Sequence, residues 1–364
     1  PGMKSPSRSY SKETARKFNA CWSANLIIMA IFLVSGVARA EWHADARPKM
    51  GTEVSVYFWH ENEARGDAII EEIFAEVDRV NALMSTYVEA SLISDINRRA
   101  ADEPVVAGEE LFQLIRRSLD ISVLTRGAFD ITYDSVGQHY DFRERRRPDA
   151  ATVEVERRNI DFRFVELDQG KGTVRFEQQG VRINLGGIAK GYVVERGVDI
   201  LRRHGVEHGV VTAGGDSRLL GDRRGRPWMI GIRDPRKDGD VAISVPLEDE
   251  AISTSGDYER YFDEDGTRYH HIIKPSSGRP VEGVHSATVI GPDAVMTDAL
   301  STSVFVMGVD EGLRLIGCLP DYEAIVIDAD QQIFYSSGLA DPGSAEADSA
   351  LSTPPAGTCA GEQR

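Results

Sequence analysis

The segment NLGGIAKGYVVERG, residues 184–197, constrains the fold of this chain most. A short apolar strand is expected to end at the paired Gly186 and Gly187, and a helical pattern follows. Glycine lets the backbone approach a bulky anion closely, and the exposed amides at a helix start attract negative charge. With Lys190 and Gly191, the turn therefore suggests a phosphate-bearing ligand. Its spacing fits neither the dinucleotide fingerprint nor the phosphate loop of nucleotide hydrolases, so plain turn chemistry is the alternative.

Hydrophobic periodicity predicts a mixture of helices and short strands along the chain. Apolar residues at three- and four-residue intervals indicate amphipathic helices, whereas short apolar or alternating runs between Gly and Pro turns indicate strands. The expected helices cover residues 66–83, 109–124, the stretch after the glycine turn, 293–307 and 310–317. The expected strands cover residues 53–59, 162–167, 173–178, 181–185, 209–213, 227–233, 242–247, 285–291, 323–328 and 332–337.

The charge balance excludes one class of partner. A formal net charge of −16 over 364 residues argues against a protein that holds nucleic acid through a basic face. The one basic run, Arg143 to Arg147, is interrupted by Glu144, and we interpret it as solvated surface, with partner contact as the alternative. The three cysteines show neither CxxC spacing nor a cluster with histidine, so no zinc site is expected.

The two ends of the chain differ in composition from the centre. Basic residues precede an apolar run from Leu26 to Val34, and Ala38-Arg39-Ala40 follows. This order predicts a secretory signal over residues 1–40, cleaved after Ala40, with an uncleaved membrane anchor as the alternative. Residues 339–364 contain almost no large apolar side chain, which predicts a disordered tail. The folded part of an exported protein would then cover residues 41–338.

Asp298 and Thr302 form a candidate cation site. They are four residues apart in a helical stretch, so their oxygens project from one face about one turn apart. Magnesium prefers oxygen ligands and commonly takes only one or two protein carboxylates. The alternative is a helix-start Asp with a Thr that bonds the carbonyl behind it. We expect a polar helix face for Asp298, so that Asp298→Ala leaves the fold largely intact.

Two adjacent histidines and several aromatic residues complete the candidate groups. His270 and His271 precede a Pro and Gly turn, and because neighbours on a strand point to opposite faces, at most one is expected in a site. The segments GAFDIT (127–132) and MSTY (84–87) each contribute an aromatic ring that stacks on a planar ligand or fills a core.

Eight ordered segments together resemble one family. They are MSTY…SLISDIN, GAFDIT, INLGGIAKGYVVERG, TAGGD, GRPWMIGIRDP, ISTSGDYERYF, RYHHIIKPSSGRP and TVIGPDAVMTDALST. In this order they are similar to the FAD:protein FMN transferases of the ApbE family, over roughly residues 48–338. The resemblance implies an α/β (α+β) fold of mixed, largely antiparallel sheets with packed helices in a two-lobed, T-fold-like arrangement.

The resemblance also implies a reaction and a set of site residues. An exported enzyme of this kind binds FAD and Mg²⁺, moves FMN onto a threonine of a partner protein and releases AMP. The implied metal ligands are the carbonyl of Ala189 and the side chains of Asp298 and Thr302. The implied catalytic residues are Asp298 and His271, the latter as general base or phosphate contact. The implied flavin contacts are Met50, Tyr87, Ala128, Phe129, Asp130, Lys190, Tyr192, His271 and Ile272.

The chain departs from the family pattern at two positions, and other activities stay open. Lys274 stands where an Asp commonly precedes the proline, and Ile131 stands where a Pro is common. The expected partner is a threonine-bearing subunit of a membrane-bound electron-transfer complex facing the periplasm, with peripheral membrane association as an option and no nucleic acid. The alternatives are a Mg²⁺-dependent FAD pyrophosphatase and a non-catalytic exported flavin-binding protein.

Overall fold

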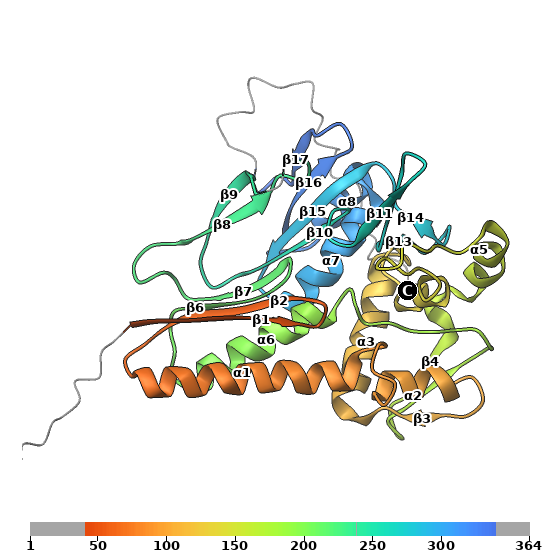
Figure 1. Ribbon diagram of the computed structural model, residues 1–364, viewed down its shortest axis with the longest axis horizontal. Helices are drawn as coiled ribbons and strands as arrows, with labels where there is room; N and C mark the ends of the chain where they lie inside the picture. The colour runs from red at the N-terminus through yellow and green to blue at the C-terminus, as the bar shows by residue number, and fades with distance from the viewer. Residues whose placement is uncertain (1–40, 238, 340–364) are drawn as a thin grey trace, which may run out of the picture. The chain divides into compact units, whose positions relative to one another are not determined.

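One antiparallel sheet organises the protein, whose computed structural model describes residues 41–237 and 239–339. Within these ranges, eight strands form the sheet in the order β1-β2-β6-β7-β10-β15-β16-β17, and every neighbouring pair is antiparallel (Figure 1). The expected mixed fold of helices and largely antiparallel sheets is therefore confirmed. The strands are β1 Glu41–Lys49, β2 Thr52–His60, β6 Gly209–Ala213, β7 Asp216–Leu220, β10 Ala251–Gly256, β15 Val284–Gly291, β16 Glu323–Asp328 and β17 Ile333–Tyr335.

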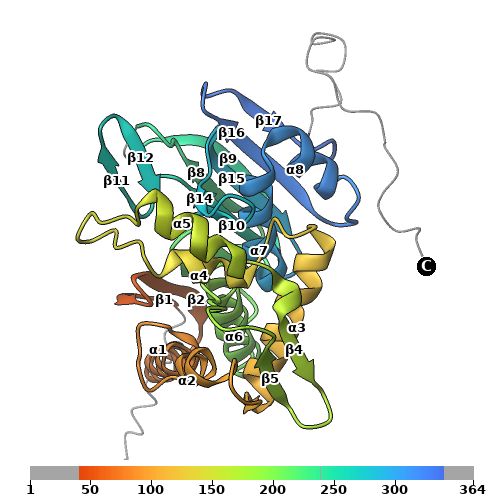
Figure 2. The same ribbon diagram turned by 90° about the vertical axis from the view of Figure 1, so that its right-hand side faces the viewer.

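The two faces of this sheet bury different partners. Along β2, Val54, Val56 and Phe58 pack with helices α1 and α6, whereas Tyr57 faces a separate cluster with the hairpin β8–β9. This alternation is the two-residue period of a strand covered on both sides. Helices α1 and α6 cover the β2–β6 region, while α7 covers β10 and β15 and α8 contacts β16 (Figures 1 and 2).

The helices follow the apolar periodicity of the sequence. The predicted helices at 66–83 and 109–124 appear as α1 and α3, and their apolar residues are buried on one side. The helix predicted from Asp293 is α7, and the Asp293 carboxylate accepts a hydrogen bond from the Met296 amide at 3.1 Å as its N-cap. The helices are α1 Glu63–Met84, α2 Leu92–Arg99, α3 Gly108–Leu124, α4 Asp134–Gly137, α5 Ala150–Glu156, α6 Ala189–Arg203, α7 Ala294–Met307 and α8 Val309–Ile316.

Small sheets and single turns of 3₁₀ helix connect these elements. The small sheets are β3-β5-β4 and the hairpins β8–β9, β11–β12 and β13–β14. Their strands are β3 Val105–Val106, β4 Val165–Asp168, β5 Thr173–Phe176, β8 Trp228–Arg233, β9 Val241–Leu247, β11 Tyr261–Glu264, β12 Thr267–His270, β13 Ile273–Lys274 and β14 Arg279–Pro280. The 3₁₀ turns are Ile131–Tyr133, Arg157–Asn159 and Phe162–Phe164, so the strand expected at 162–167 begins only at Val165.

The strand expected at residues 181–185 is wrong. The segment has no neighbouring strand, because side chains and a loop carbonyl satisfy its backbone instead. The Ile183 amide donates to Asn97 Oδ1 at 2.8 Å, and Asn97 Nδ2 donates to the Ile183 carbonyl at 2.9 Å. The Asn184 amide donates to the Ile131 carbonyl at 2.9 Å. An apolar run that ends in Gly-Gly predicted extended chain, but not which groups would pair with it.

The predictions for the two ends of the chain are not addressed by this structure. The signal segment at 1–40 and the tail from residue 340 lie outside the described residues. Among the helices within residues 41–237 and 239–339, none combines the length and apolar character needed to cross a membrane.

Candidate active site

A cavity of about 230 Å³ collects most of the predicted site residues. Its lining comes from the β1–β2 turn, the chain after α1, the loop before the Ile131–Tyr133 turn, the glycine turn before α6, the end of β10, the His271 segment and α7. The predicted residues that line it are Met50, Tyr87, Ala128, Phe129, Asp130, Ala189, Lys190, His271, Ile272 and Thr302. Segments that are distant in the sequence therefore form one site.

The glycine turn meets α7 through the carboxylate of Asp298. Asp298 Oδ2 accepts a hydrogen bond from the amide of Gly191 at 2.8 Å, in the first turn of α6. Helix α6 has no side-chain N-cap of its own, so a carboxylate from α7 satisfies one of its free amides and complements its dipole. Asp298 is 1% exposed, so the polar face of α7 expected for it, which also carries Ser301 and Thr302, is packed against Lys190 and Ser255 and is not solvated. Nearly all of α7 is buried.

Lys190 lies between two buried carboxylates. Its Nζ contacts Asp216 Oδ2 and lies 3.3 Å from Asp298 Oδ1. Burial alone would lower the pKa of Lys190, but the two carboxylates outweigh burial and raise it, so the ammonium stays charged. Burial, together with the negative charge of Asp298, raises the pKa of Asp216. Asp216 Oδ1 is buried and has no hydrogen-bond partner among the described residues.

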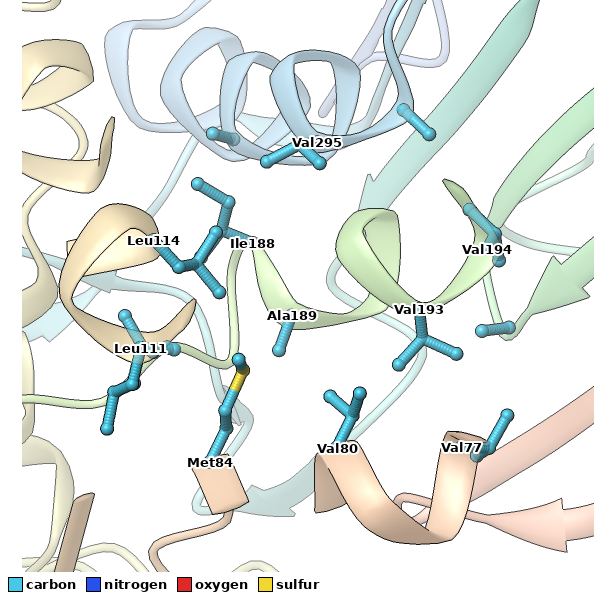
Figure 3. Close-up of a cluster of buried hydrophobic side chains, with 14 of the residues drawn as sticks. Val77, Val80, Met84, Leu111, Leu114, Ile188, Ala189, Val193, Val194 and Val295 are labelled. Atoms are coloured by element: carbon cyan, nitrogen blue, oxygen red, sulfur yellow. The ribbon is translucent and has the colours of Figure 1, made fainter. Parts of the chain in front are cut away.

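Serine hydroxyl groups lie close to Thr302, the second side chain predicted to bind the cation. Thr302 Oγ1 lies 3.2 Å from Ser255 Oγ, which also pairs with Ser301 Oγ at 2.9 Å. A Cβ at Gly187 would lie 3.5 Å from Thr302 Oγ1 and 3.2 Å from the Phe129 ring, so the glycine keeps this part of the cavity open. The methyl group of Ala189 points into the apolar core near Met84 (Figure 3). Only its backbone is therefore available to a ligand.

The two histidines separate as expected. His270 is buried, with Nε2 2.8 Å from the carbonyl oxygen of Val281 and its ring edge-on to Phe305, which is a structural role. His271 lines the cavity, and its Nδ1 is buried without a hydrogen-bond partner in the described ranges. Burial, with the positive charge of Arg260 as the next cause, lowers the pKa of His271 well below its ordinary value. The imidazole is therefore neutral at neutral pH.

Asp130 and Tyr192, two of the implied flavin contacts, each form side-chain hydrogen bonds within the protein. The Asp130 carboxylate accepts from the amide and hydroxyl of Thr132 at 2.8 and 2.6 Å and from the Phe162 amide at 2.9 Å. Its side chain therefore caps the Ile131–Tyr133 turn at the cavity wall. Tyr192 does not line the cavity, and its hydroxyl donates to Glu110 at 2.6 Å.

The two departures from the family pattern lie in different environments. Ile131 is buried, lines the cavity and offers its carbonyl to the Asn184 amide. Lys274 is exposed on β13, where it pairs with Arg279 in the hairpin, and it does not line the cavity although both of its neighbours do. Neither residue contacts the Asp298 and Thr302 pair through a hydrogen bond or ion pair in the described part of the chain.

The sequence left three polar residues of this site unassigned: Asp216, Ser255 and Arg260. Each lies in a segment that the motif comparison included, TAGGD or ISTSGDYERYF. The signal for Asp216 was an Asp directly after paired glycines, which equally predicts a simple hairpin, and β6–β7 is a hairpin. Its position beside Lys190 depends on how the sheet places β7 under α6.

Comparison with known proteins identifies relatives of this chain. The profile of the ApbE family matches residues 50–326. A protein named FAD:protein FMN transferase from Treponema pallidum (strain Nichols) is 30% identical over 334 residues, covering 86% of this chain and 92% of its own length. One of the same name from Klebsiella pneumoniae (strain 342) is 32% identical over 275 residues, covering 74% and 85%.

Solved structures show the same fold. The crystal structure of the ApbE protein from Thermotoga maritima superposes with a TM-score of 0.76 at 34% identity, over 82% of this chain and 98% of that one. The flavin transferase ApbE from Vibrio cholerae superposes with a TM-score of 0.72 at 29% identity, over 82% and 98%. On the match of the profile, the relatives and the fold, this chain belongs to the ApbE family.

Proposed function

We propose that the protein is an FAD:protein FMN transferase. The observation that carries this proposal is the cavity in which the glycine turn, the aromatic segments and Thr302 of α7 meet, with Asp298 buried beside it and bonded to the Gly191 amide. In the reaction, a hydroxyl oxygen of the acceptor protein forms a bond to the phosphorus nearest riboflavin. The bond from that phosphorus to the bridging oxygen breaks, AMP leaves with that oxygen, and the hydroxyl proton passes to a base.

The residues present suit a magnesium ion. The donors are all oxygen, from the Asp298 carboxylate, the Thr302 hydroxyl and the Ala189 carbonyl, which is the chemistry that Mg²⁺ prefers. The unpaired, buried Oδ1 of Asp216 supports a cation here, because two carboxylates face only one ammonium. Within the described ranges no group of three or more His, Cys, Asp and Glu side chains is placed to hold a metal ion, so the proposed site depends on hydroxyl and carbonyl oxygens beside one carboxylate. When bound, the ion would neutralise phosphate charge.

His271 is the residue we propose as proton acceptor. The neutral imidazole of His271 lines the cavity and can take a proton from a hydroxyl that enters it. The Arg260 and Lys190 charges that hold its pKa down are opposed once a pyrophosphate occupies the cavity, which makes the imidazole a better base in the complex. Lys190 and the amides of the glycine turn orient the phosphates.

The acceptor and the compartment belong to the same proposal. We infer that the acceptor hydroxyl is a threonine of a membrane-bound electron-transfer subunit, and that the enzyme works in the periplasm after cleavage following Ala40. The order of basic residues, apolar run and Ala-Arg-Ala in the sequence supports export.

One incubation tests the activity against its alternatives. Purified protein, FAD, Mg²⁺ and a threonine-bearing domain of an exported redox protein are combined, and flavin fluorescence in a denaturing gel is read with AMP release. A fluorescent acceptor with AMP is the expected result. Free FMN with AMP would indicate a pyrophosphatase, and intact FAD would indicate a flavin carrier. The exposed Asp310→Ala serves as the control for Asp298→Ala.

A further inference from the structure

Arg260 is the one lysine or arginine in the wall of the active-site cavity that has no ion-pair partner among the described residues. The wall contains two such cations, Lys190 and Arg260. Lys190 is held between the buried carboxylates of Asp216 and Asp298. The side chain of Arg260 is exposed, and within residues 41–237 and 239–339 it forms neither a hydrogen bond nor an ion pair. Its guanidinium is therefore available to a ligand in the cavity.

The carboxylates in the same wall already have partners. They are Asp130 with the Thr132 hydroxyl, Asp134 with the Arg182 guanidinium, and Glu259 with the Arg233 guanidinium. Glu53 follows the lining residue Thr52 and has no ion pair in the part of the chain that the structure describes, but it is exposed and does not line the cavity. The unpaired charge that the wall presents to a ligand is therefore the positive charge of Arg260.

The hydroxyl of Tyr133 is a second donor in this wall, and no described residue accepts its proton. It lies beside the glycine turn, because a Cβ built on Gly186 would be 3.5 Å from the Tyr133 hydroxyl oxygen. Burial raises the pKa of Tyr133, the negative charge of Asp134 adds to this, and the positive charge of Arg260 opposes it. The phenol therefore keeps its proton and can donate it to an anion that Arg260 also attracts.

The proposed reaction needs more positive charge than the Lys190 cluster supplies. With both carboxylates ionised, Lys190, Asp216 and Asp298 together carry one negative charge, and with a divalent cation added they carry one positive charge. The pyrophosphate of FAD brings two negative charges. When the bond from phosphorus to the bridging oxygen breaks, its electron pair stays on the AMP oxygen, so the AMP phosphate gains a further negative charge. A cation beside that phosphate stabilises this developing charge.

We propose that Arg260, assisted by Tyr133, binds the phosphate of FAD that leaves with AMP. This inference rests on the proposed function, which defines AMP as the leaving group. The planar guanidinium can donate two parallel hydrogen bonds to phosphate oxygens, and the phenol donates one more. Lys190 and the glycine turn then hold the phosphate that stays with FMN. Arg260 therefore favours FAD over FMN, which lacks the second phosphate.

The test compares three ligands by calorimetric titration of the full exported chain in EDTA, so that no Mg²⁺-dependent reaction consumes them. The ratio of the FMN and riboflavin association constants reports the contact with the FMN phosphate, and the ratio for FAD and FMN reports the contact with the AMP half. Arg260→Gln should lower the FAD-to-FMN ratio roughly tenfold and leave the FMN-to-riboflavin ratio unchanged. Tyr133→Phe should lower the FAD-to-FMN ratio roughly threefold.

A matched variant and a pair of competitors locate the contact. Arg279→Gln removes an exposed arginine of β14 that also has no ion pair in the described residues and lies outside this cavity, and it should keep both ratios. AMP should displace FAD from the wild type more effectively than adenosine does, and Arg260→Gln should remove that difference. Equal displacement by AMP and adenosine from the wild type would overturn the proposal, as would a lower FMN-to-riboflavin ratio or an unchanged FAD-to-FMN ratio in Arg260→Gln.

The transfer assay separates this inference from the proposed function. No AMP release by the wild type, with Arg260-dependent selectivity for FAD, would refute the transferase and leave a phosphate-binding site. Normal transfer with Arg260-independent selectivity would refute the phosphate contact alone. Because the AMP phosphate gains charge only as the bond breaks, Arg260→Gln should lower kcat as well as FAD affinity. An unchanged kcat at saturating FAD would refute the contact with the leaving group.

Discussion

Replacing Asp298 by alanine should affect both the stability of the protein and its chemistry. The side chain caps the Gly191 amide and is one of two buried carboxylates beside Lys190. Alanine removes the acceptor of that amide and one proposed ligand of Mg²⁺. The same substitution therefore tests two roles of Asp298: a ligand of Mg²⁺, and the acceptor that caps the Gly191 amide in the first turn of α6.

The expected loss of stability depends on which buried polar groups Asp298→Ala leaves without a partner. The Gly191 amide would be left without its buried acceptor, which costs about 1–3 kcal/mol. The remaining Lys190 and Asp216 form a balanced pair, so the penalty of about 3–5 kcal/mol for an unpaired buried charge is not incurred. Domains are stable by roughly 5–15 kcal/mol, so the variant should fold.

The assay combines urea denaturation with thermal unfolding at increasing Mg²⁺. Wild-type protein should gain stability with Mg²⁺ by mass action, and Asp298→Ala should gain none and should release no AMP. Asp310→Ala, an exposed Asp on α8, should match the wild type within about 0.5 kcal/mol. Mg²⁺-dependent AMP release by Asp298→Ala would refute the metal assignment, and a stability equal to that of Asp310→Ala would refute the cap.

Three further substitutions test packing, flavin contact and pH dependence. Gly191→Ala should destabilise the protein by about 3 kcal/mol or more in urea, because a Cβ would lie 2.1 Å from the Ala294 carbonyl oxygen. Gly317→Ala, whose Cβ would lie 3.4 Å from the Leu313 carbonyl oxygen, should change stability by less than about 1 kcal/mol. Tyr192→Phe should leave FAD affinity unchanged in a fluorescence titration, since the hydroxyl donates to Glu110 outside the cavity. Weaker FAD binding would support the flavin contact that the family resemblance implies for Tyr192. Burial raises the pKa of Asp130 to about 6, so the folded state holds this proton more tightly than the unfolded state, and unfolding free energy should fall by up to about 3 kcal/mol as pH rises from about 4 to about 6. The same decline in Asp130→Asn would contradict this.

Elements with a clear apolar period could be predicted from the sequence, because burial on one side requires that period. The stretch at 66–83 and the strand at 53–59 carry it, and the structure extends them only slightly as α1 and β2. The strand β1 and the helix α2 were not predicted. Helix α2 is short and mostly polar, and it is stabilised by Ser91 as N-cap and by tertiary contacts of Asn97.

The residues of the candidate site also divide into those that the sequence predicts and those whose position depends on packing. Residues inside long motifs, such as Phe129, Lys190 and Thr302, were placed at the cavity wall by resemblance, and the structure brings them there. Asp216 was not recognised, because a single Asp after Gly-Gly carries no information about a lysine on α6. That pair forms only when the sheet and the helix pack together.

The glycine turn shows how one motif can serve two physical purposes. Gly186 and Gly187 line the cavity, so their missing side chains leave room for a ligand, as the phosphate interpretation requires. Gly191 does not line it, and a Cβ there would collide with the backbone of α7 and with Asp298. This glycine therefore allows α6 and α7 to approach closely enough for the Asp298 carboxylate to reach the Gly191 amide. Because the cap holds the same carboxylate that we propose as a cation ligand, helix packing and metal binding depend on each other at this position.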